Sequence, residues 1–421
     1  MVLFIDMNSY FASCEQQVNY YLRNRPVGVC VYTGKYGAII SPSIEAKKRG
    51  VKTGMRLNEG MQLCPELVPL PTNPTLYREN HKKIMNVLRK YAGDEVIPKS
   101  IDEAVVNLKS YELIYKTMDA KIELANKIKQ DIRDKVGDYL KCSIGIAPNG
   151  FLAKLASDIQ KPDGLTIITP ENIDEVLSKL QLTDLPGIAS AMAKRFSLAG
   201  IDTPLKLRHA EPAALKRASQ SIVGLYWHYR LNFSEVDMIT QPYKNMQAMR
   251  HLSQDQRRSV PTMENILVSL CMTLEKRMVK HEVYCREIHV NFSYNSDFRW
   301  KWDSATKPLQ DGAELYHIIK AQMDAYEKES GEKLLSYDIS GVGVTVSGFV
   351  TADVLQIDLF ENNVRQDTLR RAVYDLKDRF GYDKLLRAIE LDETSRATDI
   401  IGFGNIKDMQ QNTDKKNFNS V

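Results

Sequence analysis

The sequence lacks several features that would assign it to a specialised class of protein. It has only 6 cysteines in 421 residues, and no two of them have the Cys-x-x-Cys spacing. This argues against a zinc site and a disulfide framework, and it fits a reducing cytoplasm. No apolar stretch is long enough to span a bilayer. The first apolar run is interrupted by Asp6 and has no basic start, so no signal peptide is expected.

The chain also has no large excess of positive or negative charge, because its formal net charge is only +4. Apolar residues make up 43% and charged residues 26%, as is typical of a globular chain without low-complexity runs. So small an excess means that any binding to a polyanion must come from local basic patches. With 421 residues the chain is too long for one hydrophobic core and should divide into several domains.

Acidic residues occur where two apolar runs meet polar sequence. Residues 2–5 lead to Asp6, and Asp102 and Glu103 precede a second apolar run. If these runs are neighbouring strands, the three carboxylates converge at one sheet edge, where hard oxygen donors suit Mg²⁺. Two such ions would clamp the attacking and leaving oxygens of a phosphoryl transfer. The alternative is that the Asp-Glu pair is only a solvated turn.

Further segments accompany these acids in a fixed order. Residues 6–15 read Asp-Met-Asn-Ser-Tyr-Phe-Ala-Ser-Cys-Glu, and residues 100–104 read Ser-Ile-Asp-Glu-Ala. Residues 142–158 begin Cys-Ser-Ile-Gly-Ile-Ala-Pro-Asn-Gly-Phe-Leu-Ala-Lys, and Lys-Pro-Asp-Gly follows at 161–164. In this order the segments resemble the Y-family (translesion) DNA polymerases of the UmuC/DinB-type bacterial branch, the UmuC type most of all. The resemblance runs from residue 1 to about residue 400 and is most specific over the first 165 residues.

The resemblance implies a right-hand polymerase built from α/β and α+β domains. Helical patterns near 77–91 and 119–135 alternate with strands near 96–108 and 140–146, which predicts a sheet with helices on one side. The expected parts are a palm (1–10 and 75–170), small fingers (11–74), a helical thumb (171–238), a linker (239–249), a little finger (250–352) and a C-terminal clamp-binding tail (353–421).

The resemblance also assigns catalytic and metal-binding roles. Asp6, Asp102 and the carbonyl of Met7 would hold the nucleotide-side Mg²⁺, and Glu103 would join the two aspartates at a second ion. Mn²⁺ is an alternative ion. The assignment of Glu103 rests on the family motif.

Six positions match those that bind the incoming deoxynucleoside triphosphate: Ser9, Tyr10, Phe11, Ser41, Lys47 and Lys161. Phe11 falls on the steric gate that excludes a 2′-hydroxyl, with ordinary core packing as the alternative. A solvated helix face is the alternative for Lys47 and Lys48.

Four residues in the same region depart from the family pattern. Lys47 replaces the usual arginine and Ile44 the usual tyrosine, so a point charge replaces a bidentate fork and a hydrogen-bond donor is lost. Both changes predict weak nucleotide binding. Asn8 and Ser9 also depart from the acid-rich version of their loop but leave the number of metal ligands intact.

Basic residues gather where contact with primer–template DNA is expected. Residues 185–230 contain seven Lys or Arg and two acids, and Leu-Pro-Gly-Ile-Ala at 185–189 resembles a helix-hairpin-helix turn that offers N–H groups to phosphate. Ala189 replaces the last glycine of that turn, and a plain helix turn is the alternative. The DNA-binding candidates are Gly187, Ile188, Lys194, Arg195, Arg257, Arg258, Arg299 and Lys301, with Arg250 nearby.

A short C-terminal stretch suggests a protein partner. Gln356, Leu359 and Phe360 belong to a Gln-Ile-Asp-Leu-Phe run that resembles the peptide by which bacterial polymerases dock in the sliding clamp. A strand-end core is the alternative. A basic amphipathic helix over 369–380 follows, and the tail beyond residue 409 is polar enough to be disordered. The resemblance leaves open whether an accessory subunit is needed.

Together these features predict a cytoplasmic, low-fidelity translesion polymerase of the DNA-damage (SOS) response, without proofreading. A clamp-tethered scaffold that has lost catalysis is the alternative, and it predicts missing metal ligands. A palm-type nucleotidyl cyclase would not need the basic helical and little-finger domains.

Overall fold

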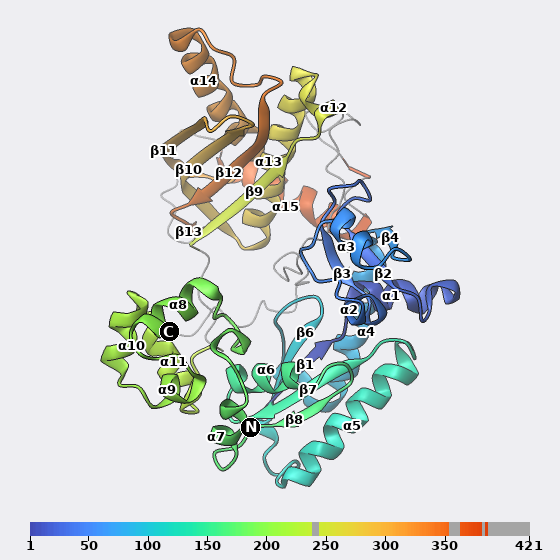
Figure 1. Cartoon of the computed structure of the whole chain (residues 1–421). Helices are drawn as coiled ribbons and strands as arrows, with labels where there is room; N and C mark the ends of the chain where they lie inside the picture. The colour runs from blue at the N-terminus through green and yellow to red at the C-terminus, as the bar shows by residue number, and fades with distance from the viewer. Residues whose placement is uncertain (238–243, 353–362, 381–383, 386–421) are drawn as a thin grey trace. The chain divides into compact units, whose positions relative to one another are not determined.

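The protein divides into two compact units, Met1–Thr240 with Asp399–Val421, and Gln241–Thr398 (Figure 1). The structure is a computed structural model that describes residues 1–237, 244–352, 363–380 and 384–385. Among the helices described, none combines the length and apolar character needed to cross a membrane.

A five-stranded sheet of order β5-β6-β1-β7-β8 forms the centre of the first unit. β1 lies in the middle and is antiparallel to both neighbours, and its register sets Asp6 opposite Glu103 of β6. The strands are β1 (Val2–Met7), β5 (Val96–Pro98), β6 (Glu103–Asn107), β7 (Cys142–Ala147) and β8 (Leu165–Ile167). The predicted neighbouring strands that carry the acids are therefore present.

Helices cover both faces of this sheet. Successive side chains of a strand point to opposite faces. Leu3 and Ile5 of β1 join the core that contains α4 (Pro74–Ala92) and α5 (Met118–Lys135). Val2 and Phe4 join the core that contains α6 (Gly150–Ile159). The prediction of helices on one side only is wrong, because α6 packs on the second face.

The predicted fingers contain a small sheet of order β3-β2-β4 with its own core. Its elements are β2 (Val27–Cys30), β3 (Ile39–Pro42), β4 (Val68–Pro71), α2 (Ile44–Lys48) and α3 (Leu57–Leu63). α1 (Tyr10–Val18) packs instead in the large core with α4. The predicted boundary at residue 11 therefore falls inside one helix.

The predicted thumb is helical, as its sequence pattern indicated. Its helices are α7 (Ile173–Ser178), α8 (Ser190–Leu198), α9 (Pro204–His209), α10 (Pro212–Ser219) and α11 (Val223–Leu231). Trp227 of α11 is buried and meets Phe151 of α6 edge-on, with ring centroids 5.4 Å apart. This contact joins the thumb helices to the second face of the central sheet. Short 3₁₀ turns occur at η1 (Tyr20–Leu22), η2 (Gly93–Glu95), η3 (Lys109–Tyr111) and η4 (Leu182–Asp184).

The second unit is an antiparallel sheet of order β11-β10-β12-β9, with β13 paired to β10. α13 and α14 contribute to the core on one face of the sheet. Its elements are β9 (Asn245–His251), β10 (Val283–Tyr294), β11 (Arg299–Leu309), β12 (Ile339–Ser347), β13 (Val350–Thr351), α12 (Gln254–Arg257), α13 (Val260–Lys280) and α14 (Gly312–Ser330). The predicted linker at 239–249 is wrong from residue 245 onward, because β9 begins there and pairs with β12.

Helix α15 (Asn363–Phe380) belongs to this second unit rather than to a free tail. Tyr284 donates a hydrogen bond to Asp367 at 2.8 Å, and Arg370 donates one to Asp311 at 3.0 Å. The predicted amphipathic helix is present, but it buries Arg370 and exposes Leu369. The ion pairs of Arg370 and the buried Tyr374, rather than the exposed leucines, therefore attach α15 to the domain.

Candidate active site

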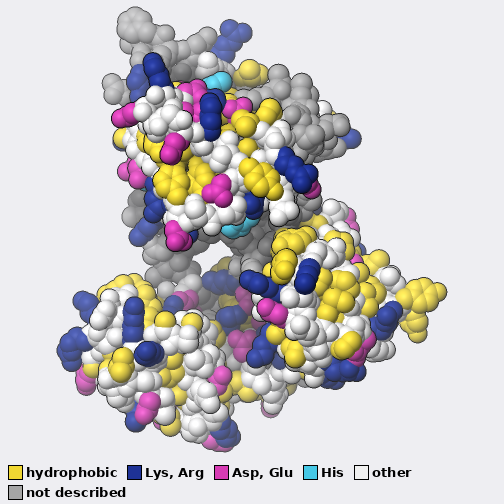
Figure 2. All heavy atoms as spheres, turned by 45° about the horizontal axis from the view of Figure 1, so that its top comes forward, with side chains coloured by type: hydrophobic (Ala, Val, Ile, Leu, Met, Phe, Trp, Pro, Cys, Tyr) yellow, Lys and Arg dark blue, Asp and Glu magenta, His cyan; other side chains and the backbone are white. Residues whose placement is uncertain are grey.

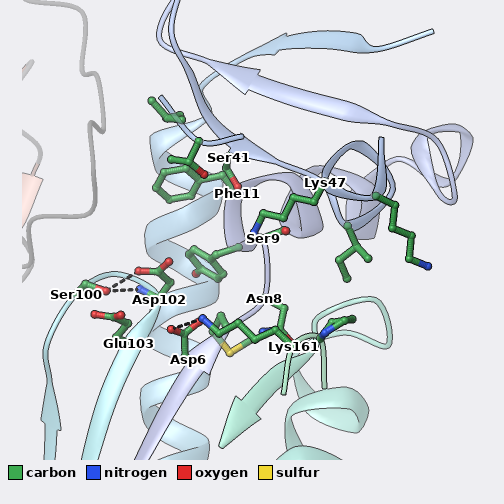
Figure 3. Close-up of a pocket in the computed structure, with 17 residues that line it drawn as sticks. Asp6, Asn8, Ser9, Phe11, Ser41, Lys47, Ser100, Asp102, Glu103 and Lys161 are labelled. Carbon is green, nitrogen blue, oxygen red and sulfur yellow. Dashed lines mark hydrogen bonds and ion pairs between the residues drawn. The ribbon is translucent and has the colours of Figure 1, made fainter. Parts of the chain in front are cut away.

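A pocket of about 620 Å³ opens where β1 ends (Figure 3). Its walls come from the start of α1, from β3 and α2, from the turn between β5 and β6, and from the loop after α6. The lining residues are Asp6, Met7, Asn8, Ser9, Tyr10, Phe11, Ile40, Ser41, Ile44, Lys47, Lys48, Thr53, Ser100, Asp102, Glu103, Lys161 and Pro162. Every residue predicted to bind metal or nucleotide therefore lines one pocket.

The three acids lie on one side of the pocket (Figure 3). The N–H of Met7 donates to the carbonyl of Asp102 at 2.9 Å, which fixes the β5–β6 turn against the end of β1. Ser100 donates its hydroxyl to the Asp102 carboxylate. In the described part of the chain, no three His, Cys, Asp or Glu side chains are arranged to hold a metal ion. The acids thus share a pocket without forming a ready-made cluster of three donors.

Burial makes the two aspartates costly to ionise. The pKa of Asp6 is raised to about 6, chiefly by burial, with a smaller contribution from the charge of Glu103 and against the opposing effect of Lys161. Burial also raises the pKa of Asp102, again with a contribution from Glu103. Carboxylates that repel one another in a poorly solvated pocket gain most from a nearby cation.

Lysine side chains supply that positive charge in the structure. The ammonium of Lys161 lies 2.9 Å from an oxygen of Asp6 and 2.8 Å from one of Asp158. Glu103 forms an ion pair with Lys154 of α6, whose ammonium also lies 4.8 Å from the centroid of the Phe4 ring. Burial opposes protonation of Lys154, but Glu103 raises its pKa overall.

Lys154 is a functional candidate that was not assigned from the sequence. It lies within the 142–158 segment that carried the family resemblance, so the signal was present. Its role depends on α6 packing against the face of the sheet next to Glu103, which the sequence pattern did not predict.

Lys47 enters the pocket from the opposite wall, on α2 (Figure 3). The pocket wall desolvates its ammonium and lowers the pKa of Lys47, and the positive charge of Lys161 lowers it further. Within the described chain the ammonium of Lys47 has no hydrogen bond or ion pair. A lysine whose charge is disfavoured by burial and by a neighbouring lysine is suited to binding an anion.

Asn8 connects the end of β1 to the loop that carries Lys161. Its amide nitrogen donates to the hydroxyl of Ser143 at 3.1 Å, and its amide oxygen accepts from the N–H of Asp163 at 2.7 Å. A carboxylate at this position would lack the donor for Ser143. This network explains why an asparagine fits where the family pattern often has an acid.

The aromatic and hydroxyl residues of α1 have mixed surroundings. Phe11 lines the pocket and also stacks on Tyr77, with ring centroids 4.4 Å apart, so it is a core residue as well. Tyr10 is buried and donates to the carbonyl of Tyr77 at 2.7 Å. The buried hydroxyl of Ser9 has no hydrogen-bond partner in the described chain, while that of Ser41 accepts from Ala12 at 3.4 Å.

The DNA-binding candidates of the thumb differ in whether their polar groups are already hydrogen-bonded within the fold. Gly187 adopts a φ of 89°, which suits the predicted turn. The side chain of Ile188 is buried, and its N–H donates to the carbonyl of Leu185 at 3.0 Å. The phosphate contact predicted for Ile188 therefore has no free donor. Lys194 is exposed, and Arg195 is exposed but also donates to the carbonyl of Ser219 at 3.1 Å.

The second-unit candidates lie around the open side of its sheet. Arg299 and Lys301 are exposed on β11 and flank the buried Trp300, as the alternation predicted. The same face also carries His289 and Asp303, whose side chains lie 2.6 Å apart, so its charge is mixed.

Two further candidates near α12 have partners within the domain. Arg257 donates to Asn295 at 3.1 Å, and Arg258 pairs with Asp255 at 3.4 Å. The predicted clamp-binding residues Gln356, Leu359 and Phe360 lie outside the described residues.

Comparison with known proteins matches both units. The model of the impB/mucB/samB family matches residues 5–158, and that of the impB/mucB/samB family C-terminal domain matches residues 243–359. The chain is 36% identical over 204 residues to DNA polymerase IV of Saccharolobus solfataricus, covering 48% of this chain and 56% of that protein. It is 30% identical over 398 residues to DNA polymerase IV of Moorella thermoacetica, covering 93% and 96%. The chain thus spans about half the length of the archaeal relative and nearly all of the bacterial one.

Solved structures show the same fold. A Y-family DNA polymerase chimera built on Dbh covers 83% of this chain and 99% of its own, with 24% identity and a TM-score of 0.65. A ternary complex of Dbh has 25% identity, a TM-score of 0.56 and the same coverage. These likenesses support the expected mixed α/β multidomain fold. The finer preference for the UmuC type stays a prediction, because the relatives named here are called DNA polymerase IV.

Proposed function

The chain belongs to the impB/mucB/samB family of Y-family DNA polymerases, and from this membership we propose that it is a template-directed DNA polymerase of the translesion type. The observation that carries the proposal is the single pocket that unites Asp6, Asp102 and Glu103 with Lys47 and Lys161. Acids on one wall, where Lys161 pairs with Asp6, and the ammonium of Lys47 on the other wall suit the metal ions and the triphosphate of a nucleotidyl transfer.

The donor chemistry of the pocket fits divalent cations. Asp6, Asp102, Glu103 and the carbonyl of Met7 are hard oxygen donors, the type that Mg²⁺ prefers. The pKa values of Asp6 and Asp102 are raised chiefly by burial and further by the charge of Glu103, and a bound cation would stabilise the ionised carboxylates. When bound, the ions would stabilise charge on the phosphates and lower the pKa of the primer 3′-hydroxyl. We propose these four groups as the ligands of two Mg²⁺ ions, with Mn²⁺ able to substitute.

The remaining pocket residues bind and orient the nucleotide. Lys47 and Lys161 bind the triphosphate by charge, and the unpartnered hydroxyl of Ser9 supplies a hydrogen bond. Phe11, held against Tyr77, limits the space beside the sugar. Ile44 lines the pocket without a polar group, which leaves the triphosphate with fewer donors than the family pattern provides.

The scaffold alternative is not favoured, because it predicts missing metal ligands and all three acids are present. The open pocket and small fingers favour low fidelity and tolerance of damaged templates. Thumb and little finger would hold primer–template DNA through Gly187, Lys194, Arg195, Arg257, Arg258, Arg299 and Lys301. The sliding clamp as a partner, through Gln356, Leu359 and Phe360, rests on the sequence alone, and so does an accessory subunit.

Primer extension tests the proposal. The purified chain is given Mg²⁺, a primed undamaged template and each deoxynucleotide in turn. We expect addition of the nucleotide complementary to the template, and no addition by Asp102→Ala/Glu103→Ala, which should still bind DNA. Binding of DNA by the wild type without any extension would contradict the proposal and favour the scaffold.

A further inference from the structure

The loop that carries Lys161 also carries a carboxylate that does not line the pocket. This loop, residues 160–164, joins α6 to β8. Lys161 points toward Asp6 (Figure 3), whereas Asp163 contacts two basic residues of α5. Asp163 has a φ of 59°, in the left-handed region that residues other than glycine rarely adopt. Such a backbone conformation persists only where neighbouring groups hold it.

Lys129 of α5 makes the closest contacts with this loop. Its ammonium donates to the carbonyl oxygens of Asp163 at 2.6 Å and of Gly164 at 3.2 Å, and it lies 3.0 Å from a carboxylate oxygen of Asp163. Only 10% of the Lys129 side chain is exposed. A buried ammonium needs such partners to offset its lost hydration. Because two of these partners are consecutive main-chain carbonyls, Lys129 fixes the backbone of the loop directly.

Two further contacts hold Asp163. Arg133, one turn further along α5, donates to the other carboxylate oxygen of Asp163 at 2.8 Å. The N–H of Asp163 donates to the amide oxygen of Asn8 at 2.7 Å. A Cβ on Gly164 would lie 2.0 Å from the carbonyl oxygen of Gln160, so the loop closes tightly on itself. The loop therefore has little room to move between α5 and the end of β1.

The place of the Lys161 ammonium depends on this main chain. In the described structure the ammonium pairs with Asp6 at 2.9 Å and with Asp158 at 2.8 Å. Asp6 is proposed above as a metal ligand, so its pairing with Lys161 competes with metal binding. The loop must then place the ammonium.

Accurate placement matters because little else guides a triphosphate to the pocket. Figure 2 shows basic and acidic side chains interspersed over the described part of the face that it displays, and the net charge is only +4. A surface of mixed charge attracts an anion only weakly at long range. A lysine offers a point charge without the fixed fork of arginine. Binding therefore depends on how closely the ammonium can approach the phosphates.

We propose that Lys129, assisted by Arg133, is a positioning residue for nucleotide binding. Neither side chain lines the pocket. Lys129 fixes the main chain at Asp163 and Gly164 and thereby places the ammonium of Lys161 against the triphosphate. The inference rests on the proposed polymerase function.

Nucleotide affinity measured without catalysis tests this role. The protein is bound to a primed template whose primer ends in a dideoxynucleotide, and the complementary deoxynucleoside triphosphate is titrated with Mg²⁺ present. Lys129→Met keeps the length of the side chain and removes its charge. We expect it to lower the affinity about tenfold, because the hydrogen bond from Lys161 to a charged phosphate is weakened. In a Lys161→Ala background, Lys129→Met should cause no further loss.

Lys121→Met is the matched control. Lys121 is also a buried lysine of α5, but it donates to the carbonyls of Lys116 and Thr117 near the start of its own helix, at 3.2 and 3.3 Å. Urea denaturation measures the stability of both variants. We expect Lys121→Met to lose stability as Lys129→Met does, yet to bind the nucleotide as the wild type does.

Arg133→Met provides a second variant, since 38% of the Arg133 side chain is exposed and its loss disturbs the fold less. It should lower the affinity by less than Lys129→Met, and it decides by the same criteria if Lys129→Met does not fold. An unchanged affinity, an equal loss in Lys121→Met, or an equal loss with and without Lys161 would each overturn the positioning role.

A primer with a free 3′-hydroxyl, extended in parallel, tests the polymerase itself. Extension by a wild type whose Lys129→Met variant binds the nucleotide normally would refute the positioning role alone. A wild type that neither binds the complementary nucleotide selectively nor extends the primer would refute the polymerase, and the positioning role with it.

Discussion

At the scale of single residues, Asp6 shows the tension between stability and chemistry. Its pKa in the fold is about 6, above the ordinary 3.8, chiefly because it is buried. A raised pKa means that the native state binds the proton more tightly than the unfolded state, so ionised Asp6 lowers the free energy of unfolding progressively as the pH rises from about 4 to about 6. Metal binding requires the ionised carboxylate of Asp6, so the fold retains this residue despite the loss in the free energy of unfolding.

Asp6→Asn should therefore stabilise the protein near neutral pH while abolishing extension. We expect its free energy of unfolding to rise by about 1–3 kcal/mol near neutral pH. The gain should shrink as the pH falls through about 6 and vanish near pH 4. Urea denaturation at both ends of this range measures it, and a variant less stable than the wild type at neutral pH would contradict the account of Asp6.

Lys47 is expected to act on nucleotide binding. Lys47→Ala should raise the nucleotide KM about tenfold or more, because a hydrogen bond to a charged group is lost, and Lys47→Arg should lower it by restoring the bidentate fork. Arg49→Ala is the control, because Arg49 lies at the end of α2, close to Lys47 in sequence, but pairs with Glu66. Steady-state kinetics for the three variants measure the effect. An unchanged KM for Lys47→Ala would contradict the nucleotide-binding role and mean that Lys47 only forms part of a solvated helix face.

Phe11 should decide between deoxyribonucleotides and ribonucleotides. Because it packs on Tyr77, Phe11→Ala will also destabilise the core, by about 3–5 kcal/mol. The ratio of ribonucleotide to deoxynucleotide incorporation is independent of the fraction folded, so this ratio is the measurement. We expect it to rise at least tenfold, and an unchanged ratio would mean that another group excludes the 2′-hydroxyl.

The pocket residues could be predicted from the sequence because they stand in compact motifs. The pairing of Lys154 with Glu103, 51 positions away, and the bridge from Asn8 to Asp163 could not be predicted. Both depend on how α6 and the loop after it pack against β1. Spacing along the chain does not carry that information.

At the scale of elements, the close approach of α6 to β7 depends on Gly145. A Cβ there would lie 2.0 Å from the carbonyl oxygen of Ala153 and 2.4 Å from the N–H nitrogen of Ser157. Gly145→Ala must push the helix backbone away, and we expect a loss of about 3 kcal/mol in the free energy of unfolding.

Gly343→Ala in β12 is the matched control for Gly145→Ala. A Cβ at Gly343 would meet only ordinary contacts, the nearest 3.4 Å away at Met249, so its effect should stay below about 1 kcal/mol. Urea denaturation compares the two variants. Equal effects would mean that the helix–strand distance does not set the cost.

The long helices could be predicted because their apolar periodicity extends over many turns. Strand β9 could not be predicted in the same way, because its sequence Asn-Met-Gln-Ala-Met-Arg-His contains no Val, Ile, Thr, Phe, Tyr or Trp. Its strand conformation comes from pairing with β12. The face that α15 turns toward the domain could not be predicted either, because it is the face with Arg370, which forms salt bridges with Asp311 and Asp367, and not the face with the leucines.

At the scale of the whole molecule, DNA binding must come from patches because the net charge is only +4. Arg299 and Lys301 lie on a sheet face that also carries Asp303, so their contribution is local. Arg299→Ala/Lys301→Ala should weaken DNA binding uniformly across sequences and reduce the slope of log affinity against log salt by up to about 2. Lys333→Ala, which removes an exposed ammonium that pairs only with Glu327, should leave the slope unchanged. A salt titration by anisotropy decides, and equal slopes for all three proteins would exclude phosphate contacts from this face.

The most direct test of the whole account is extension past a lesion. A running primer approaches one abasic site in the template, with Mg²⁺ and all four deoxynucleotides present, beside the Asp102→Ala/Glu103→Ala variant. We expect the wild type to continue beyond the site and the variant to add nothing on either damaged or undamaged template. A wild type that copies undamaged DNA but always stops at the site would contradict the translesion assignment.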